Sequence, residues 1–176
     1  SWDEIVVEAQ KAQPLRSIID PGYSRFFAAG HMEEKIRDFC AATGQPQPET
    51  VGEVARCIYE SLALKYRWAL ERLEEIKGAR IESFNIVGGG IQNKLLNQMA
   101  ADATNRPVTT GPIEGAAIGN LLMQAMALGE LKNLEELRQV VRNSEPVHTY
   151  EPHHTQAWED AYGKLLRFQA QEAPQP

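Results

Sequence analysis

The chain has 176 residues, 43% of them hydrophobic and 24% charged, and a formal net charge of −6. This length suits one domain or at most two small ones, and no apolar run approaches the ~20 residues that cross a bilayer. The first residues, SWDEIVVEAQ, lack the basic start and apolar centre of a signal peptide, and no basic stripe could neutralise a nucleic-acid backbone. We therefore expect a cytoplasmic protein without membrane or nucleic-acid partners.

The first part of the chain is predicted to be mainly helical. Residues 3–12 suit a short helix, and 20–30 (DPGYSRFFAAG) suit an ordered loop, because this segment has neither a helical nor a strand period. The run MEEKIRDFCAATG (32–44) predicts a helix that ends at Gly44. The residues of this helix expected to face inward are Ile36, Phe39 and Cys40.

The strongest helix signal begins at Thr50, which forms a capping-box pattern with Glu53. Apolar residues then recur at helical spacing as far as Lys77, which predicts a helix of about seven turns. The residues expected on its inward face are Val51, Val54, Ala55, Ile58, Leu62, Tyr66, Ala69, Leu73 and Ile76. The other aromatic residues of this helix, Tyr59 and Trp68, are interpreted as packing residues like Tyr66.

Short strands and helices alternate in the next part. IESFNIV (81–87) is rich in apolar and β-branched residues, which predicts a buried strand running into three glycines. A helix follows and closes near Asn105, 106–110 suit a second strand, and Gly111 and Pro112 lead into another helix. The expected inward residues are Ile91, Leu95, Leu96, Met99 and Ala103 in the first helix, and Ala117, Ile118, Leu121, Leu122 and Ala125 in the second. This order favours a parallel strand pair with a right-handed crossover.

Two more helices are predicted towards the end. Asn133 to Glu136 repeats a capping pattern, and Thr155 can cap a last helix. Their expected apolar residues are Leu134, Leu137, Val140 and Val141, then Trp158, Ala161, Tyr162, Leu165 and Leu166. We expect a helix-rich α/β fold over residues 1–170 and a disordered tail over 171–176.

The three glycines 88–90 are the strongest candidate for a binding turn. A dinucleotide motif needs G-x-G-x-x-G and a later acid, but Asn93 stands at the third glycine position. A Walker motif needs Gly-Lys-Ser/Thr, but Lys94 is followed by Leu95. Two interpretations remain. The glycines could let a phosphate or an adenosine lie against the backbone near a helix start, or they could merely permit a tight turn.

Other residues carry weaker signals. Cys40 and Cys57 are interpreted as buried reduced thiols, although packing of their helices could allow a bridge on oxidation. The pair 153–154 (His-His) is interpreted as polar surface and not as a metal site. Asp102 is expected to face solvent or make a structural bond, and Glu114 to act at a helix start. We predict no metal ligand or catalytic residue in this chain.

The run VGGGIQNKLLNQMAADATNRPVTTGPIEGAAIGNLLMQAMALGEL (87–131) resembles the last portion of the FGGY carbohydrate kinases. The family has glycines after a core strand, a Gln-Asn pair, a helix with Ala-Asp, a strand with Val and a Glu-x-x-Ala-x-Gly helix. The matching residues are Gly88 to Gly90, Gln92, Asn93, Ala101, Asp102, Val108, Glu114 and Gly119. The upstream run 18–64 is similar to the rhamnulokinase pattern within this family, with D-P, G-Q-P-x-P, A-R-C-I and S-L-A-L.

This resemblance implies part of the C-terminal actin-like (ribonuclease H-like) ATPase domain. Family enzymes have two such domains, with the sugar mainly on the first and the nucleotide mainly on the second. They use ATP and Mg²⁺, and rhamnulokinases phosphorylate L-rhamnulose at its 1-hydroxyl. The glycine turn is therefore expected to bind the nucleotide. The residues implied are Gly89 as the closest contact, Gly88 and Gly90 beside it, and then Gln92 and Asn93.

One departure from the family is plain. The family's catalytic base is an aspartate in a G-x-x-D-type motif, and this sequence has no such motif. We therefore expect a C-terminal fragment that is inactive alone, with L-rhamnulose bound through the missing N-terminal part. Two alternatives stay open: another FGGY kinase, for xylulose, glycerol or fuculose, or a noncatalytic helical interaction module.

Overall fold

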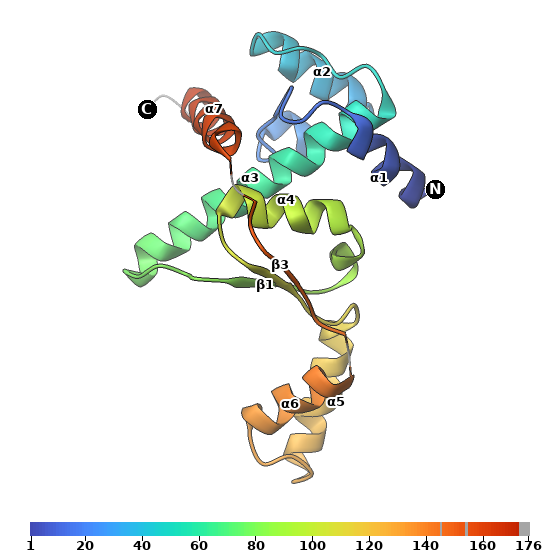
Figure 1. Cartoon of the computed structure of the whole chain (residues 1–176), viewed down its shortest axis with the longest axis vertical. Helices are drawn as coiled ribbons and strands as arrows, with labels where there is room; N and C mark the ends of the chain where they lie inside the picture. The colour runs from blue at the N-terminus through green and yellow to red at the C-terminus, as the bar shows by residue number, and fades with distance from the viewer. Residues whose placement is uncertain (145, 154, 173–176) are drawn as a thin grey trace.

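The computed structural model describes residues 1–144, 146–153 and 155–172 (Figure 1). Helices dominate, and three short strands form one sheet. In chain order the elements are α1 (Trp2–Lys11), the 3₁₀ helix η1 (Ser24–Phe27), α2 (Met32–Ala42), α3 (Val51–Lys77), β1 (Phe84–Ile86), the 3₁₀ helix η2 (Gly89–Gln92), α4 (Lys94–Thr104), β2 (Val108–Thr110), α5 (Gly115–Ala127), α6 (Leu134–Ser144), β3 (His148–Tyr150) and α7 (Gln156–Glu172).

Local sequence signals fix the ends of the long helix α3. The Thr50 hydroxyl accepts a hydrogen bond from the Glu53 N–H at 3.2 Å, and the Glu53 carboxylate accepts one from the Thr50 N–H at 3.2 Å. Gly78 ends the helix in the left-handed region, with φ of 69°, which glycine adopts without a Cβ penalty. The capping box and the predicted end of the helix are thus confirmed.

Helix α3 is the central element of the main core, and it packs against α1, α4 and α7. Buried apolar residues from α3, α4 and α7, from α2 and from the 18–19 segment form one cluster. The predicted inward residues of α2 are all buried, and four of the five predicted in α7 are buried, the exception being Leu166 at 40% exposed. The 20–30 segment, predicted as a loop, contains η1. The rings of Tyr23 and Phe26 pack against Phe39, the first edge-on and the second tilted.

The predicted inward face of α3 is wrong at both ends. Val51, Leu73 and Ile76 are 57%, 54% and 85% exposed, because Val51 lies in the first turn and the last turns extend beyond the other helices (Figure 1). Ala69 is exposed as well. In the middle, two polar residues are buried instead. The Ser61 hydroxyl accepts a hydrogen bond from the Ile19 N–H at 2.9 Å and donates to the Cys57 carbonyl.

The second of these buried polar residues, Glu60, is 1% exposed. Its carboxylate accepts hydrogen bonds from the Leu15 N–H at 2.9 Å and from Arg56 Nε at 2.7 Å. Burial raises the pKa of the Glu60 carboxyl, and these two donors oppose that rise. The face of α3 that lies under the 15–20 segment can therefore be partly polar. A prediction that looks for apolar residues at helical spacing does not find this face.

The sheet has the strand order β1-β2-β3. Strands β1 and β2 are parallel, as predicted. In their register Phe84 lies opposite Val108 and Ile86 opposite Thr110. Strand β3, which was not predicted, pairs antiparallel with β2. Strand β3 is only three residues long and carries no apolar run, so no strand signal marks it in the sequence.

The expectation that 81–87 forms a buried strand is wrong in extent and in burial. Strand β1 spans only Phe84–Ile86, with Phe84 and Ile86 half-buried and Asn85 exposed. Helix α4 covers one face of the sheet (Figure 1), and β1 lies at its edge. One covered face and an edge position give alternating burial and not the continuous burial of a central strand.

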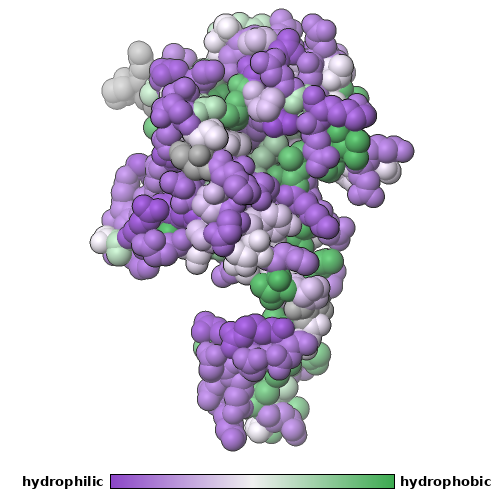
Figure 2. Space-filling view, viewed as in Figure 1, coloured by the Kyte–Doolittle hydropathy of each residue, from purple (hydrophilic) through white to green (hydrophobic). Residues whose placement is uncertain are grey.

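Helices α5 and α6 form a hairpin that projects away from the rest of the molecule (Figure 1). The inward face predicted for α5 is therefore wrong: no residue of α5 is buried, and Leu121 is 66% exposed. Figure 2 shows apolar surface where this hairpin joins the sheet and along it. The cap predicted for α6 is confirmed, because Asn133 Oδ1 accepts hydrogen bonds at 3.0 Å from the N–H groups of Glu135 and Glu136.

The disordered tail predicted from residue 171 is wrong for its first two residues, because helix α7 includes residues 171 and 172. Residues 173–176 of the predicted tail lie outside the described residues. Among the described helices, none has both the length and the apolar character needed to cross a membrane.

Candidate nucleotide site

The glycine turn connects β1 to α4. Gly88 has φ of 86°, in the left-handed region, and its N–H donates to the Pro112 carbonyl at 3.1 Å. The next residues form η2, in which the Ile91 N–H donates to the Gly88 carbonyl and the Asn93 N–H to the Gly90 carbonyl, both at 3.2 Å. Gly88 is therefore required by the backbone itself, whatever else the turn binds.

Gly89 and Gly90 are different from Gly88. Neither has a left-handed φ, and a Cβ on either would have no other heavy atom within 4 Å. No packing within the described residues explains why both positions lack a side chain. Because the backbone is bare and exposed there, a flat or anionic ligand could lie directly against it.

A second turn lies beside the first, because the parallel strands β1 and β2 end at the same edge of the sheet. The Gly111 N–H donates to the Ile86 carbonyl at 2.8 Å, and a Cβ at Gly111 would lie 2.8 Å from Val87 Cγ1, so glycine is needed for this close approach. The turn leads to the start of α5, whose first N–H groups give a partial positive charge. Ligands of α/β sheets bind at this kind of edge, outside the carboxyl ends of the strands.

The apolar surface beside the two turns adds to this arrangement. Val87 is 59% exposed and Ile113 is 43% exposed, and each is next to a glycine turn. A bare backbone can accept a phosphate or ribose, and exposed apolar side chains can contact a ring. The two turns are therefore a candidate site for a nucleotide.

The two polar residues predicted at the turn have different environments. Gln92 is exposed, whereas the Asn93 Oδ1 accepts a hydrogen bond from the Leu96 N–H at 3.0 Å and caps α4. Asn93 is thus engaged in shaping the helix start. Gln92 is available to a ligand.

Sequence reasoning missed Asn97, which lies one turn further along α4 and is 1% exposed. Its Nδ2 donates to the Ile91 carbonyl at 2.8 Å, which ties α4 to the glycine turn. Its Oδ1 is buried and has no donor among the described residues.

The acidic neighbours of the turn do not form a metal site. Asp102 Oδ1 accepts hydrogen bonds from the His153 N–H at 2.7 Å and from Gln98 Nε2 at 2.8 Å, which confirms the structural bond expected for Asp102. Glu114 is the N-cap residue of α5, although its side chain caps no N–H. Across the described part of the chain, no three His, Cys, Asp or Glu residues cluster as metal ligands, so the Mg²⁺ expected from the resemblance has no ligand set there. His154 lies outside the described residues.

The two cysteines lie in the main core, far from the glycine turn in sequence, and both are buried free thiols. The hydrogen bond with Cys40 and burial raise the pKa of the Cys57 thiol. The predicted burial of both thiols is confirmed.

Comparison with known proteins gives a consistent picture. A sequence model of the FGGY family of carbohydrate kinases, C-terminal domain, matches residues 1–128. The rhamnulokinase of Bacteroides thetaiotaomicron is 44% identical over 162 residues, which cover 92% of this chain and 33% of that protein. The rhamnulokinase of Bacillus subtilis is 43% identical over 152 residues, 86% of this chain and 31% of that protein. This chain therefore spans about a third of the length of these relatives.

Solved structures show the same fold at low sequence identity. The xylulose kinase of Rhodospirillum rubrum has a TM-score of 0.67 at 19% identity, over 97% of this chain and 34% of that one. The glycerol kinase of Plasmodium falciparum, solved with ADP, has a TM-score of 0.70 at 13% identity, over 100% of this chain and 35% of that one. The helix-rich α/β fold expected of the C-terminal actin-like domain is thereby confirmed.

Proposed function

Because the chain belongs to the FGGY family of carbohydrate kinases, we propose that it supplies the ATP-binding side of an enzyme that phosphorylates L-rhamnulose at the 1-hydroxyl. The observation that carries the nucleotide part is the bare backbone of Gly89 and Gly90 at the edge where β1 and β2 end. The identity of 44% to a rhamnulokinase over most of this chain supports the choice of sugar. An ATP-dependent reaction suits the cytoplasm, which we propose as its compartment.

We assign the residues of the two turns separate roles towards the nucleotide. Gly89 and Gly90 would let it contact the backbone, Gln92 would add a polar contact, and the start of α5 would favour negative charge. Gly88 and Asn93 would shape the turn, and Asn93 would act through the cap of α4. Bound ATP would supply the phosphoryl group. Phosphoryl transfer depends mainly on positioning and charge stabilisation, so this chain would contribute by orienting the nucleotide.

Nucleotide binding can be tested on this chain by thermal unfolding. We expect ADP at about 100 times its dissociation constant to add about 2.7 kcal/mol to the unfolding free energy. For a chain of this size that corresponds to a rise of about 5–10 °C in Tm. Pyrophosphate at equal ionic strength is the control for a general anion effect. A cooperative transition that ADP does not move would refute the nucleotide site and favour a noncatalytic helical module.

The sugar side of the cleft and the catalytic aspartate are proposed to lie outside this chain, since no G-x-x-D motif occurs in it. We therefore expect this chain alone to release no ADP from ATP in the presence of L-rhamnulose, measured by a coupled assay. A full-length rhamnulokinase under the same conditions is the positive control. Turnover by this chain alone that depends on L-rhamnulose would overturn this proposal.

A further inference from the structure

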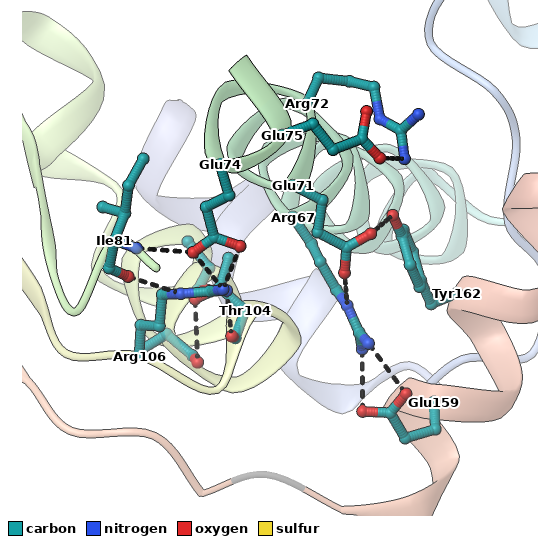
Figure 3. Close-up of polar contacts among 12 residues, drawn as sticks. Arg67, Glu71, Arg72, Glu74, Glu75, Ile81, Thr104, Arg106, Glu159 and Tyr162 are labelled. Atoms are coloured by element: carbon teal, nitrogen blue, oxygen red, sulfur yellow. Dashed lines mark hydrogen bonds and ion pairs between the residues drawn. The ribbon is translucent and has the colours of Figure 1, made fainter. Parts of the chain in front are cut away.

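An arginine at the opposite end of the sheet from the glycine turn holds several parts of the backbone together (Figure 3). Arg106 Nη2 donates to both carboxylate oxygens of Glu74, at 2.8 and 2.9 Å. Its Nε donates to the Ile81 carbonyl at 2.7 Å, and its Nη1 to the Thr104 carbonyl at 2.8 Å. With a side chain only 8% exposed, Arg106 joins the end of α3, the segment before β1 and the end of α4.

Glu74 completes this clamp, which we define as Arg106, Glu74 and Ile81. The Glu74 carboxylate accepts a hydrogen bond from the Ile81 N–H at 2.7 Å, so both backbone polar groups of Ile81 are bound. The Ile81 N–H and then Arg106 lower the pKa of Glu74, which keeps its carboxylate charged. The chain therefore enters β1 from a fixed point.

A fixed entry matters because β1 and β2 pair over only three residues. So short a pair has little register preference of its own, and a shift by one residue moves every side chain to the other face. Such a shift of β1 would exchange the half-buried Phe84 with the exposed Asn85. It would also break the Gly111 N–H bond to Ile86 and the Gly88 N–H bond to Pro112, which hold the two turns together.

We propose that Arg106 is a positioning residue for the nucleotide turn. By fixing where β1 begins against β2, it sets the register that brings Gly88 to Gly90 beside the turn at 111–113. The functional part of this inference rests on the proposed nucleotide site. The structural part does not, because the register can be measured without any nucleotide.

A second arginine on α3 provides a matched control. Arg67 also makes a bidentate contact with a carboxylate, Glu159, at 2.9 Å for both bonds, and its side chain is 16% exposed (Figure 3). It donates to Glu71 and lies 4.1 Å from the centre of the Tyr162 ring. Arg67 joins α3 to α7, and its hydrogen-bond partners among the described residues are Glu71 and Glu159, neither of which lies in the sheet. Its loss should therefore reduce stability without changing the register.

The experiment compares Arg106→Gln with Arg67→Gln in the full chain. Amide hydrogen exchange, followed by NMR, is expected to be faster by about tenfold or more at Gly88 and Gly111 in Arg106→Gln only. The dissociation constant for ADP is expected to rise by about tenfold or more in the same variant, because the turns are no longer preorganised. Arg67→Gln should lower Tm and change neither quantity.

The possible outcomes separate the two proposals. Equal exchange at Gly88 and Gly111 in both variants would overturn the positioning role. If the unaltered chain binds no ADP, the proposed function fails, while the exchange result still tests the clamp. Should Arg106→Gln not fold, Arg106→Lys replaces it, because lysine keeps the charge but lacks the planar fork, and the same readings apply.

Discussion

Gly89→Val is expected to weaken ADP binding by about 1.4 kcal/mol or more, at least about tenfold in the dissociation constant, while leaving Tm nearly unchanged. The stability should hold because Gly89 has no left-handed φ and a Cβ there would have nothing within 4 Å. The affinity should fall because the branched side chain would stand on the bare backbone where we place the nucleotide. Calorimetric titration with ADP measures the first quantity, and thermal unfolding without ligand the second.

The matched control is Gly163→Val in α7, where a Cβ would meet a single atom, Arg167 Nη1, at an ordinary contact distance of 4.0 Å. This variant should bind ADP as the unaltered chain does. In a longer sugar kinase that contains this chain, Gly89→Val should raise the KM for ATP and leave the KM for the sugar unchanged. Equal increases in both constants would contradict the assignment of Gly89. Gly88 cannot serve in this test, because its φ of 86° would strain any other residue.

The parts of the fold that follow from local chemistry could be predicted from the sequence. The capping box at Thr50 and Glu53 acts within one turn, so its spacing alone indicates the start of α3. The parallel pairing of β1 and β2 follows from the order strand, helix, strand. The position of the glycine turn could also be predicted, since a strand that is followed by glycines and then by a helix requires a turn between them.

The parts that depend on distant contacts could not be predicted. Glu60 is buried because Leu15, far away in the sequence, donates to it, and no local pattern contains that partner. The apolar face of α5 resembles that of a core helix, yet among the described elements it packs mainly against α6. Strand β3 exists because β2 offers it a free edge, and its sequence, HTY, has no strand period of its own.

In the candidate site, too, the features set by local sequence could be predicted and those set by distant contacts could not. Its glycines could be named from the sequence, but their separate functions could not, because Gly88 is distinguished from Gly89 only by its φ and by its contact with the second turn. The brace by Asn97 and the clamp by Arg106 both join residues across turns that a linear pattern does not reveal. The role of Gly52 could not be predicted either, because in the sequence it is only one of the two residues between Thr50 and Glu53 of the capping box.

Gly52→Val is expected to lower the unfolding free energy by about 3 kcal/mol, the upper part of the range for overpacked sites. A Cβ at Gly52 would lie 2.6 Å from the Glu8 carbonyl oxygen and 2.7 Å from its carbonyl carbon. These are backbone atoms of α1, which cannot turn aside as a side chain could. Helix α1 would have to move away from α3, and part of the packing around the buried Ala9 would be lost.

Gly119→Val is the matched control, since Gly119 is also within a helix but a Cβ there would have nothing within 4 Å. Valine has a somewhat higher helix propensity than glycine, so this change should leave stability within about 0.5 kcal/mol or increase it slightly. Urea unfolding of both variants, with equal m-values, measures the difference. Equal stability of the two variants would show that the close approach of α1 to α3 at Gly52 is not a constraint on the fold. A large loss in Gly52→Val alone would instead identify this glycine as the contact that sets how closely the first helix lies on the central one.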